Sequence, residues 1–100
     1  MKANILVVDD EPAVREALSM VLDYGGYAVT EADSAAALQR IFADQAPHVV
    51  LLDVRLPDAN GLDLLPQIKK RWPGTEVIVL TGHGTLEMAV EATKRGAYNF

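Results

Sequence analysis

The chain has 100 residues, of which half are hydrophobic, 23% are charged and none is cysteine. This composition predicts one folded domain with a single core, and the missing cysteines exclude disulfides and thiolate chemistry. The formal net charge of −5 argues against binding of nucleic acid or an anionic membrane by this chain alone. Because no apolar run is long enough for a signal peptide or a membrane span, we expect a cytoplasmic protein.

The first third of the chain contains two apolar strand patterns with an amphipathic stretch between them. Apolar residues 5–8 lead directly into three acids, which is typical of a strand buried on both faces of a parallel sheet. Pro12 suits the first position of a helix that Gly25 and Gly26 end, and residues 27–32 predict a second strand. The helix has one apolar face, formed by Val14, Ala17, Leu18, Val21 and Leu22.

The same alternation of strands and helices continues to the end of the sequence. Ser34 is a suitable N-cap for a second helix, which we expect to extend through Ala43. Further elements are recognised from apolar runs, helical periodicity and the turn residues between them. They are strands over 49–53 and 77–81, helices over 62–71 and 85–95, and the start of a fifth strand over 98–100.

This alternation predicts an α/β fold, a doubly wound parallel sheet between two helical layers. Ligands of such sheets bind at the carboxyl ends of the strands, where the strand order reverses. Asp9 and Asp10 follow the first strand, Asp53 ends the third and Thr81 ends the fourth. If these three strands are neighbours, three carboxylates and a hydroxyl converge at one edge.

The clustered acids have a chemical explanation. Carboxylates this close together need a counter-charge, and magnesium prefers oxygen ligands of this kind. A carboxylate can also act as a nucleophile toward phosphorus, and phosphoryl transfer then needs mainly positioning and charge neutralisation. Thr81 and Gly82 are placed to bind phosphoryl oxygens through a hydroxyl and a main-chain N–H.

These residues resemble the receiver domain of two-component response regulators. The resemblance rests on Asp9-Asp10, on Asp53 at the start of DVRLPDANG, and on Thr81-Gly82, in this order along the whole chain. It implies a flavodoxin-like sheet with strand order 2-1-3-4-5. The stretch LTGHGTLEMAVEATKRGAYNF is similar to the receivers of nitrogen-regulation-type transcriptional activators.

The resemblance implies roles for individual residues. Asp53 would take a phosphoryl group from a sensor histidine kinase or a phosphotransfer protein. Asp10 would hold Mg²⁺ directly and Asp9 largely through water, and the main-chain carbonyl of Arg55 would complete the metal site. The domain would be a regulatory phosphoacceptor and not an enzyme in the wider sense, because it catalyses only its own phosphorylation and dephosphorylation.

The resemblance also implies a conformational switch. The hydroxyl of Thr81 would move to the phosphoryl group, and the ring of Phe100 would turn inward in response. The switch would control an output domain, transcriptional in type, that is absent from this chain.

One departure from the family lies at the carboxyl terminus. Receivers carry a lysine three residues after the switch aromatic, and this sequence stops at Phe100. We therefore expect residues 1–100 to be a receiver domain that lacks part of its last strand and its last helix, and that is unstable alone or forms a homodimer. The alternative function is an interaction module that is not phosphorylated in this form.

Other interpretations of the acids are weaker. Asp9 and Asp10 could merely favour the dipole of the following helix, and Asp53 could be a strand-end cap. A phosphatase of the haloacid-dehalogenase type also uses a strand-end aspartate as nucleophile, but it needs a second acid two residues later. If Asp53 were the nucleophile, this position would be Arg55. If Asp9 were the nucleophile, it would be Glu11, which is a poor match. A flavodoxin-like mononucleotide binder is also disfavoured, because the acids would repel the phosphate of its ligand.

Overall fold

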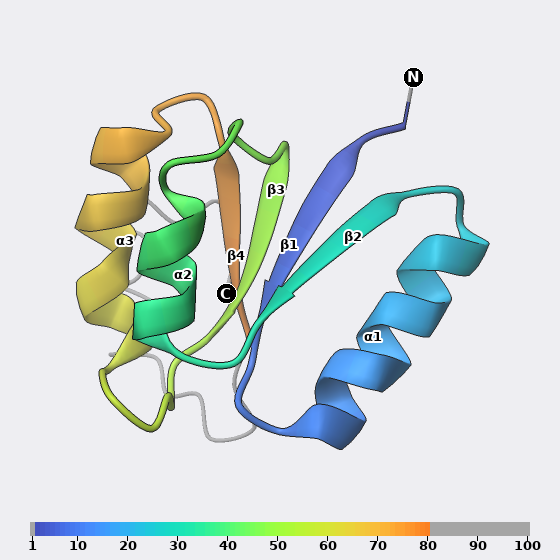
Figure 1. The fold of residues 1–100 in the computed structure, drawn as a ribbon, viewed down its shortest axis with the longest axis horizontal. Helices are drawn as coiled ribbons and strands as arrows, with labels where there is room; N and C mark the ends of the chain where they lie inside the picture. Colours follow the sequence, from blue (N-terminus) through green and yellow to red (C-terminus); the bar gives the residue numbers. More distant parts are fainter. Residues whose placement is uncertain (1, 81–100) are drawn as a thin grey trace.

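The computed structural model describes residues 2–80, in which four parallel strands form one sheet with helices on both faces (Figure 1). The strands are adjacent in the order β2-β1-β3-β4, which confirms the predicted parallel α/β fold and the order of its first four strands. The predicted fifth strand and the helix over 85–95 lie outside the described residues. The elements are β1 (Asn4–Val8), α1 (Pro12–Tyr24), β2 (Ala28–Ala32), α2 (Ala35–Ile41), β3 (Val49–Asp53), α3 (Gly61–Arg71) and β4 (Glu76–Leu80).

The strand register brings the ends of β1 and β3 to the same level. Val8 is the partner of Leu52, and Asp53 is the partner of Leu80 in β4. Asp9 therefore leaves the sheet directly beside Asp53. The parallel pairing, and not the contact of any one side chain, decides that these two acids meet.

The hydrophobic core lies between the sheet and the pair of helices α2 and α3, which cover one face (Figure 1). Alternate strand residues point to this face, as the pleat of a strand requires. At the end of α3, the indole of Trp72 is buried and meets the ring of Phe42 edge to face at 5.0 Å between centroids. Completely buried members of the core include Leu38, Val50, Leu52, Leu65, Ile68, Val77 and Val79.

Helix α1 lies on the other face, beside β1 and β2, and contains no buried residue. Val14, Leu18 and Leu22 are half-buried, but Ala17 is exposed and Val21 is 71% exposed. The apolar face predicted from the periodicity is therefore only partly covered by the rest of the described structure, and Ala17 and Val21 stay exposed. Figure 1 shows the helix beside β2, which is the outermost strand on that side of the described sheet.

The helix boundaries follow their capping residues. Pro12 is the first residue of α1, and Gly26, with a φ of 91°, follows its C-cap, as the sequence predicts. Ser34 caps α2, since its Oγ accepts a hydrogen bond from the N–H of Ala37 at 3.1 Å. This helix ends at Ile41, two residues earlier than predicted. None of the described helices is long and apolar enough to cross a bilayer.

Candidate functional site

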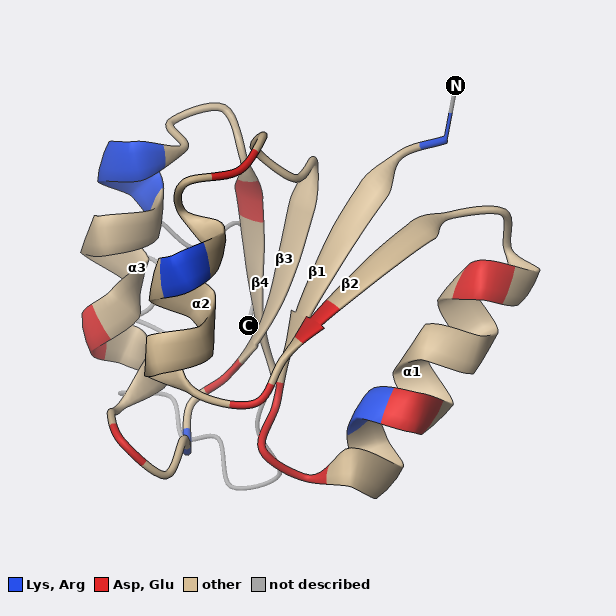
Figure 2. Cartoon of the chain, in the orientation of Figure 1, with Lys and Arg blue, Asp and Glu red and all other residues tan. Residues whose placement is uncertain are grey.

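Three of the predicted site residues come together at the carboxyl edge of the sheet. Asp9, Asp10 and Asp53 each offer a carboxylate oxygen, and these oxygens all lie within 4.8 Å of one another. Figure 2 shows that acidic residues gather where β1, β2 and β3 end, whereas the basic end of α3 lies at the opposite edge. The structure thus places the acids where the topology predicts them.

The three carboxylates differ in their surroundings. Asp9 is 7% exposed, and its Oδ1 accepts a hydrogen bond from the N–H of Glu11 at 2.9 Å. Asp10 is exposed and Asp53 is half-buried. The site therefore ranges from one carboxylate fixed within the protein to one that solvent reaches freely.

Burial is the main influence on Asp53. It raises the pKa of this carboxyl above the ordinary 3.8, and the negative charges of Asp9 and Asp10 raise the pKa further. Hydrogen bonds from the main chain of Arg55 and Val54 act in the opposite direction. The bond from the N–H of Arg55 to Oδ1 of Asp53 is 3.2 Å long and orients the carboxylate.

The turn after β3 holds the Arg55 main chain beside Asp53. Arg55 and Asn60 form an antiparallel bridge, and the N–H of Leu56 donates to the carbonyl of Ala59 at 3.2 Å. The side chain of Asn60 accepts a hydrogen bond from the N–H of Leu62 and so starts α3 directly after the turn. Of the other predicted site residues, Thr81, Gly82 and Phe100 lie outside the described residues.

Gly61 allows α3 to begin in contact with the end of β3. Its N–H donates to the carbonyl of Val54 at 2.6 Å, and a Cβ at this position would overlap the main-chain carbonyl of Asp53. Any larger residue would have to displace the backbone that carries the carboxylate. Glycine is required here by a close backbone approach.

Arg15 belongs to the site but was missed in the sequence. Its Nη1 donates to the main-chain carbonyl of Asp9 at 2.8 Å, and its Nε lies 3.3 Å from Oε1 of Glu31. It therefore links the ends of β1 and β2. Its position near the start of the predicted helix could have indicated this contact. Helical side chains point back toward the amino terminus of the helix, and here that end follows directly after Asp9 and Asp10.

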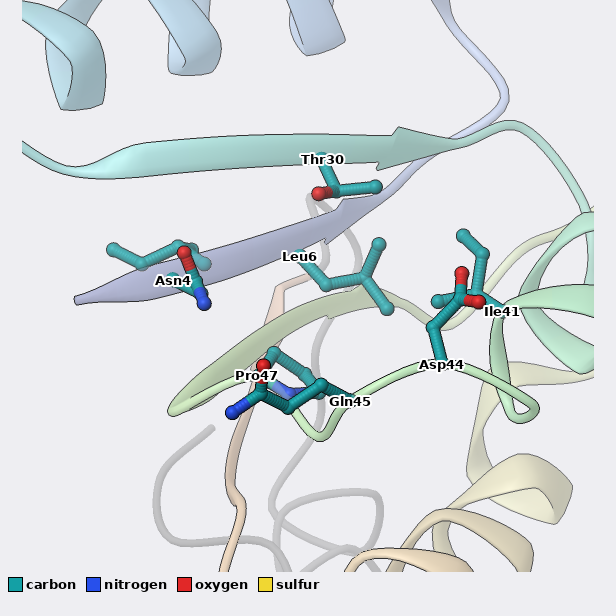
Figure 3. A pocket seen from close by; sticks show the side chains of 8 residues that line it. Asn4, Leu6, Thr30, Ile41, Asp44, Gln45 and Pro47 are labelled. Atoms are coloured by element: carbon teal, nitrogen blue, oxygen red, sulfur yellow. The ribbon is translucent and has the colours of Figure 1, made fainter. Parts of the chain in front are cut away.

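A separate hollow of about 150 Å³ lies away from the acids, over β1 and β2 (Figure 3). Leu6, Thr30, Ile41 and Asp44 are among its lining residues. None of the three clustered acids lines it, so this hollow is not part of the candidate site.

The sequence matches a known family over almost its entire length. The pattern of the response regulator receiver domain matches residues 5–100. Among curated proteins, the DNA-binding transcriptional regulator NtrC of Azospirillum brasilense is 42% identical over 98 residues, which are 98% of this chain and 20% of that protein. The chain thus spans about a fifth of the length of this relative.

Solved structures share the fold. A response regulator protein from Burkholderia pseudomallei with a phosphorylated aspartic acid, calcium ion and citrate is 30% identical, with a TM-score of 0.93 over 98% of this chain and 58% of that one. NtrX from Brucella abortus is 41% identical, with a TM-score of 0.91 over 100% of this chain and 23% of that one.

The close approach at Gly61 leads to a stability prediction. We expect Gly61→Ala to lower the free energy of unfolding by about 1–3 kcal/mol, because the new methyl group must displace backbone. Gly74→Ala is the matched control, since a Cβ there meets nothing within 4 Å, and we expect a change within about 0.5 kcal/mol. Urea denaturation of both variants measures the difference, and equal stabilities would contradict the proposed steric role.

The raised pKa of Asp53 leads to a second prediction. The folded state holds the Asp53 proton more tightly than the unfolded chain, so its stabilising contribution is present below pH 3.8 and is lost as the pH rises through the raised pKa. Without divalent cations, Asp53→Asn should be more stable than the wild type near neutral pH, and the difference should shrink on acidification. Denaturation at a series of pH values tests this; a difference independent of pH would contradict it.

Proposed function

The chain belongs to the response regulator receiver domain family, and on this premise we propose that it is a phosphoacceptor of a two-component system, with Asp53 as the acceptor. The phosphoryl donor would be a sensor histidine kinase or a phosphotransfer protein. The observation that carries the proposal is the half-buried Asp53 at a strand end, oriented by the N–H of Arg55 and flanked by two further carboxylates. Residues 1–100 would form one receiver domain.

The proposed reaction is a phosphoryl transfer to a carboxylate. An oxygen of Asp53 would attack phosphorus and form an O–P bond, while the bond from phosphorus to the donor atom breaks and its electron pair leaves with the donor. The donor atom is the imidazole nitrogen of a phosphohistidine, or an oxygen when acetyl phosphate is used. The hydrogen bond from Arg55 fixes the attacking group before the reaction, which is the kind of positioning that phosphoryl transfer requires.

The acidic cluster fits a magnesium ion. Mg²⁺ binds oxygen at about 2.1 Å, so two oxygens on one ion lie at most about 4.2 Å apart. Carboxylate oxygens within 4.8 Å of one another therefore suit one or two direct ligands and a further one through water. We assign direct contact to Asp10 and Asp53 and water-mediated contact to Asp9, with the Arg55 carbonyl as a further ligand. The bound ion would supply the positive charge that neutralises the phosphoryl oxygens.

The remaining roles rest on family membership. Thr81 and Gly82 would bind the phosphoryl oxygens, and Thr81 and Phe100 would carry the conformational switch. We expect the switch to act in the cytoplasm on a transcriptional output domain. A transcriptional output is supported by the NtrC relatives, which are named DNA-binding transcriptional regulators. Association into a homodimer stays a prediction.

The proposed acceptor can be tested by mass. We expect the intact mass of the protein to increase by one phosphoryl group after incubation with acetyl phosphate and Mg²⁺, and we expect no increase for Asp53→Asn. Asp33→Asn is the matched control, because Asp33 is an exposed carboxylate after β2 and lies outside the cluster.

Phosphorylation of Asp53→Asn to the same extent as the wild type would refute Asp53 as the acceptor. An unmodified wild type would favour the alternative function, an interaction module that does not become phosphorylated in this form.

A further inference from the structure

The carboxylate of Asp58 joins the turn after β3 to the start of α2. Its Oδ1 accepts a hydrogen bond from the N–H of Ala35 at 2.8 Å, and its Oδ2 accepts one from the N–H of Ala36 at 3.0 Å. These partners precede Asp58 by 23 and 22 residues, so the bonds are tertiary contacts. α2 thus receives a cap from Asp58 in addition to the local cap from Ser34.

Asp58 lies in a short turn whose first residues contact Asp53, and hydrogen bonds close this turn. The turn that contains Asp58 is closed by the bond from Leu56 to Ala59 and by the bridge between Arg55 and Asn60. The N–H of Arg55, at the start of this turn, donates to the Asp53 carboxylate. A displacement of Asp58 would therefore be passed to the main chain that orients the proposed acceptor.

The geometry at α2 suits a carboxylate in particular. Two N–H groups of a helix amino terminus point at its two oxygens, and hydrogen bonds to an ionised acceptor are stronger than neutral ones. The same two bonds hold the pKa of Asp58 below its usual value, so the group is ionised at neutral pH. Pro57 and Asp58 are exposed, whereas Leu56 and Ala59 on either side of them pack against the core.

We propose that Asp58 is a positioning residue for the phosphoacceptor site. By binding the amino terminus of α2, it fixes the turn that presents the Arg55 main chain to Asp53 and to the cation. This role rests on the proposed function of the Asp53 site, and it assigns to α2 a part in holding that site.

A cap that merely stabilises α2 is the competing explanation, and Ser34 separates the two. Ser34→Ala removes a cap from the same helix but leaves the turn after β3 unchanged. Asp58→Ala removes a cap and also the link to the turn. Both variants should lower the melting temperature, whereas only the second should alter the site.

Magnesium affinity, measured by calorimetric titration, provides the first test. We expect Asp58→Ala to weaken Mg²⁺ binding about tenfold, as is typical for residues that support metal ligands indirectly, and Ser34→Ala to leave the affinity unchanged. Asp58→Asn should fall between Asp58→Ala and the wild type, because its amide oxygen accepts one of the two bonds; it also replaces the alanine variant if that variant does not fold. Equal affinities for the wild type and both Asp58 variants, or equal losses in Asp58→Ala and Ser34→Ala, would overturn the proposal.

Amide NMR spectra of the metal-free protein test whether Asp58 fixes the turn, and this test does not depend on the proposed function. Asp58→Ala, or Asp58→Asn in its place, should shift the signals of Arg55 and Leu56 as well as those of Ala35 and Ala36. Ser34→Ala should shift signals around Ala37 and leave Arg55 in place. If the wild type bound no Mg²⁺, the proposed function would fail, and these spectra alone would still decide whether Asp58 fixes the turn. An unchanged Arg55 signal in the Asp58 variant would refute the proposed role of Asp58 in fixing the turn.

Discussion

Repulsion among the carboxylates of Asp9, Asp10 and Asp53 is the constraint on which the site depends. Parallel pairing of β1 with β3 makes it unavoidable, because Val8 and Leu52 are partners and the next residue of each strand is an acid. The core between the sheet and helices α2 and α3 holds these strands in register regardless of the charges at their ends. Hydrophobic burial on one face thus stabilises an arrangement that electrostatics alone would disperse.

The polar contacts around the cluster fix its geometry without neutralising it. Arg15 is the cation that contacts the cluster's main chain within residues 2–80, but it binds the carbonyl of Asp9 and the carboxylate of Glu31. Gly61 brings α3 against the end of β3, and Asp58 ties the turn to α2. The acids are therefore held in place, and the part of the chain that the structure describes gives them no shared counter-charge. Under the proposed function, a divalent cation would supply that charge at the point where a phosphoryl group would bring more negative charge.

The sequence was sufficient for the parts of the fold that depend on local pattern. Apolar runs ending in acids predicted the strands, and the rule that ligands bind at the carboxyl ends of parallel strands brought Asp9, Asp10 and Asp53 to one edge. The exposure of Val21 was not predictable in this way, because helical periodicity does not say how far a helix extends past the sheet. Asp58 was missed for a related reason: its partners lie more than 20 residues away, and only tertiary packing brings them together.

The most direct test of the central claim is the melting temperature with and without Mg²⁺, for the wild type and for Asp10→Ala. A ligand that binds only the folded state adds about 2.7 kcal/mol of stability at a hundred times its dissociation constant. We expect Mg²⁺ to raise the melting temperature of the wild type and to have a much smaller effect on Asp10→Ala. No shift in the wild type at millimolar Mg²⁺, or an equal shift in both proteins, would contradict the claim that a cation relieves the repulsion at this site.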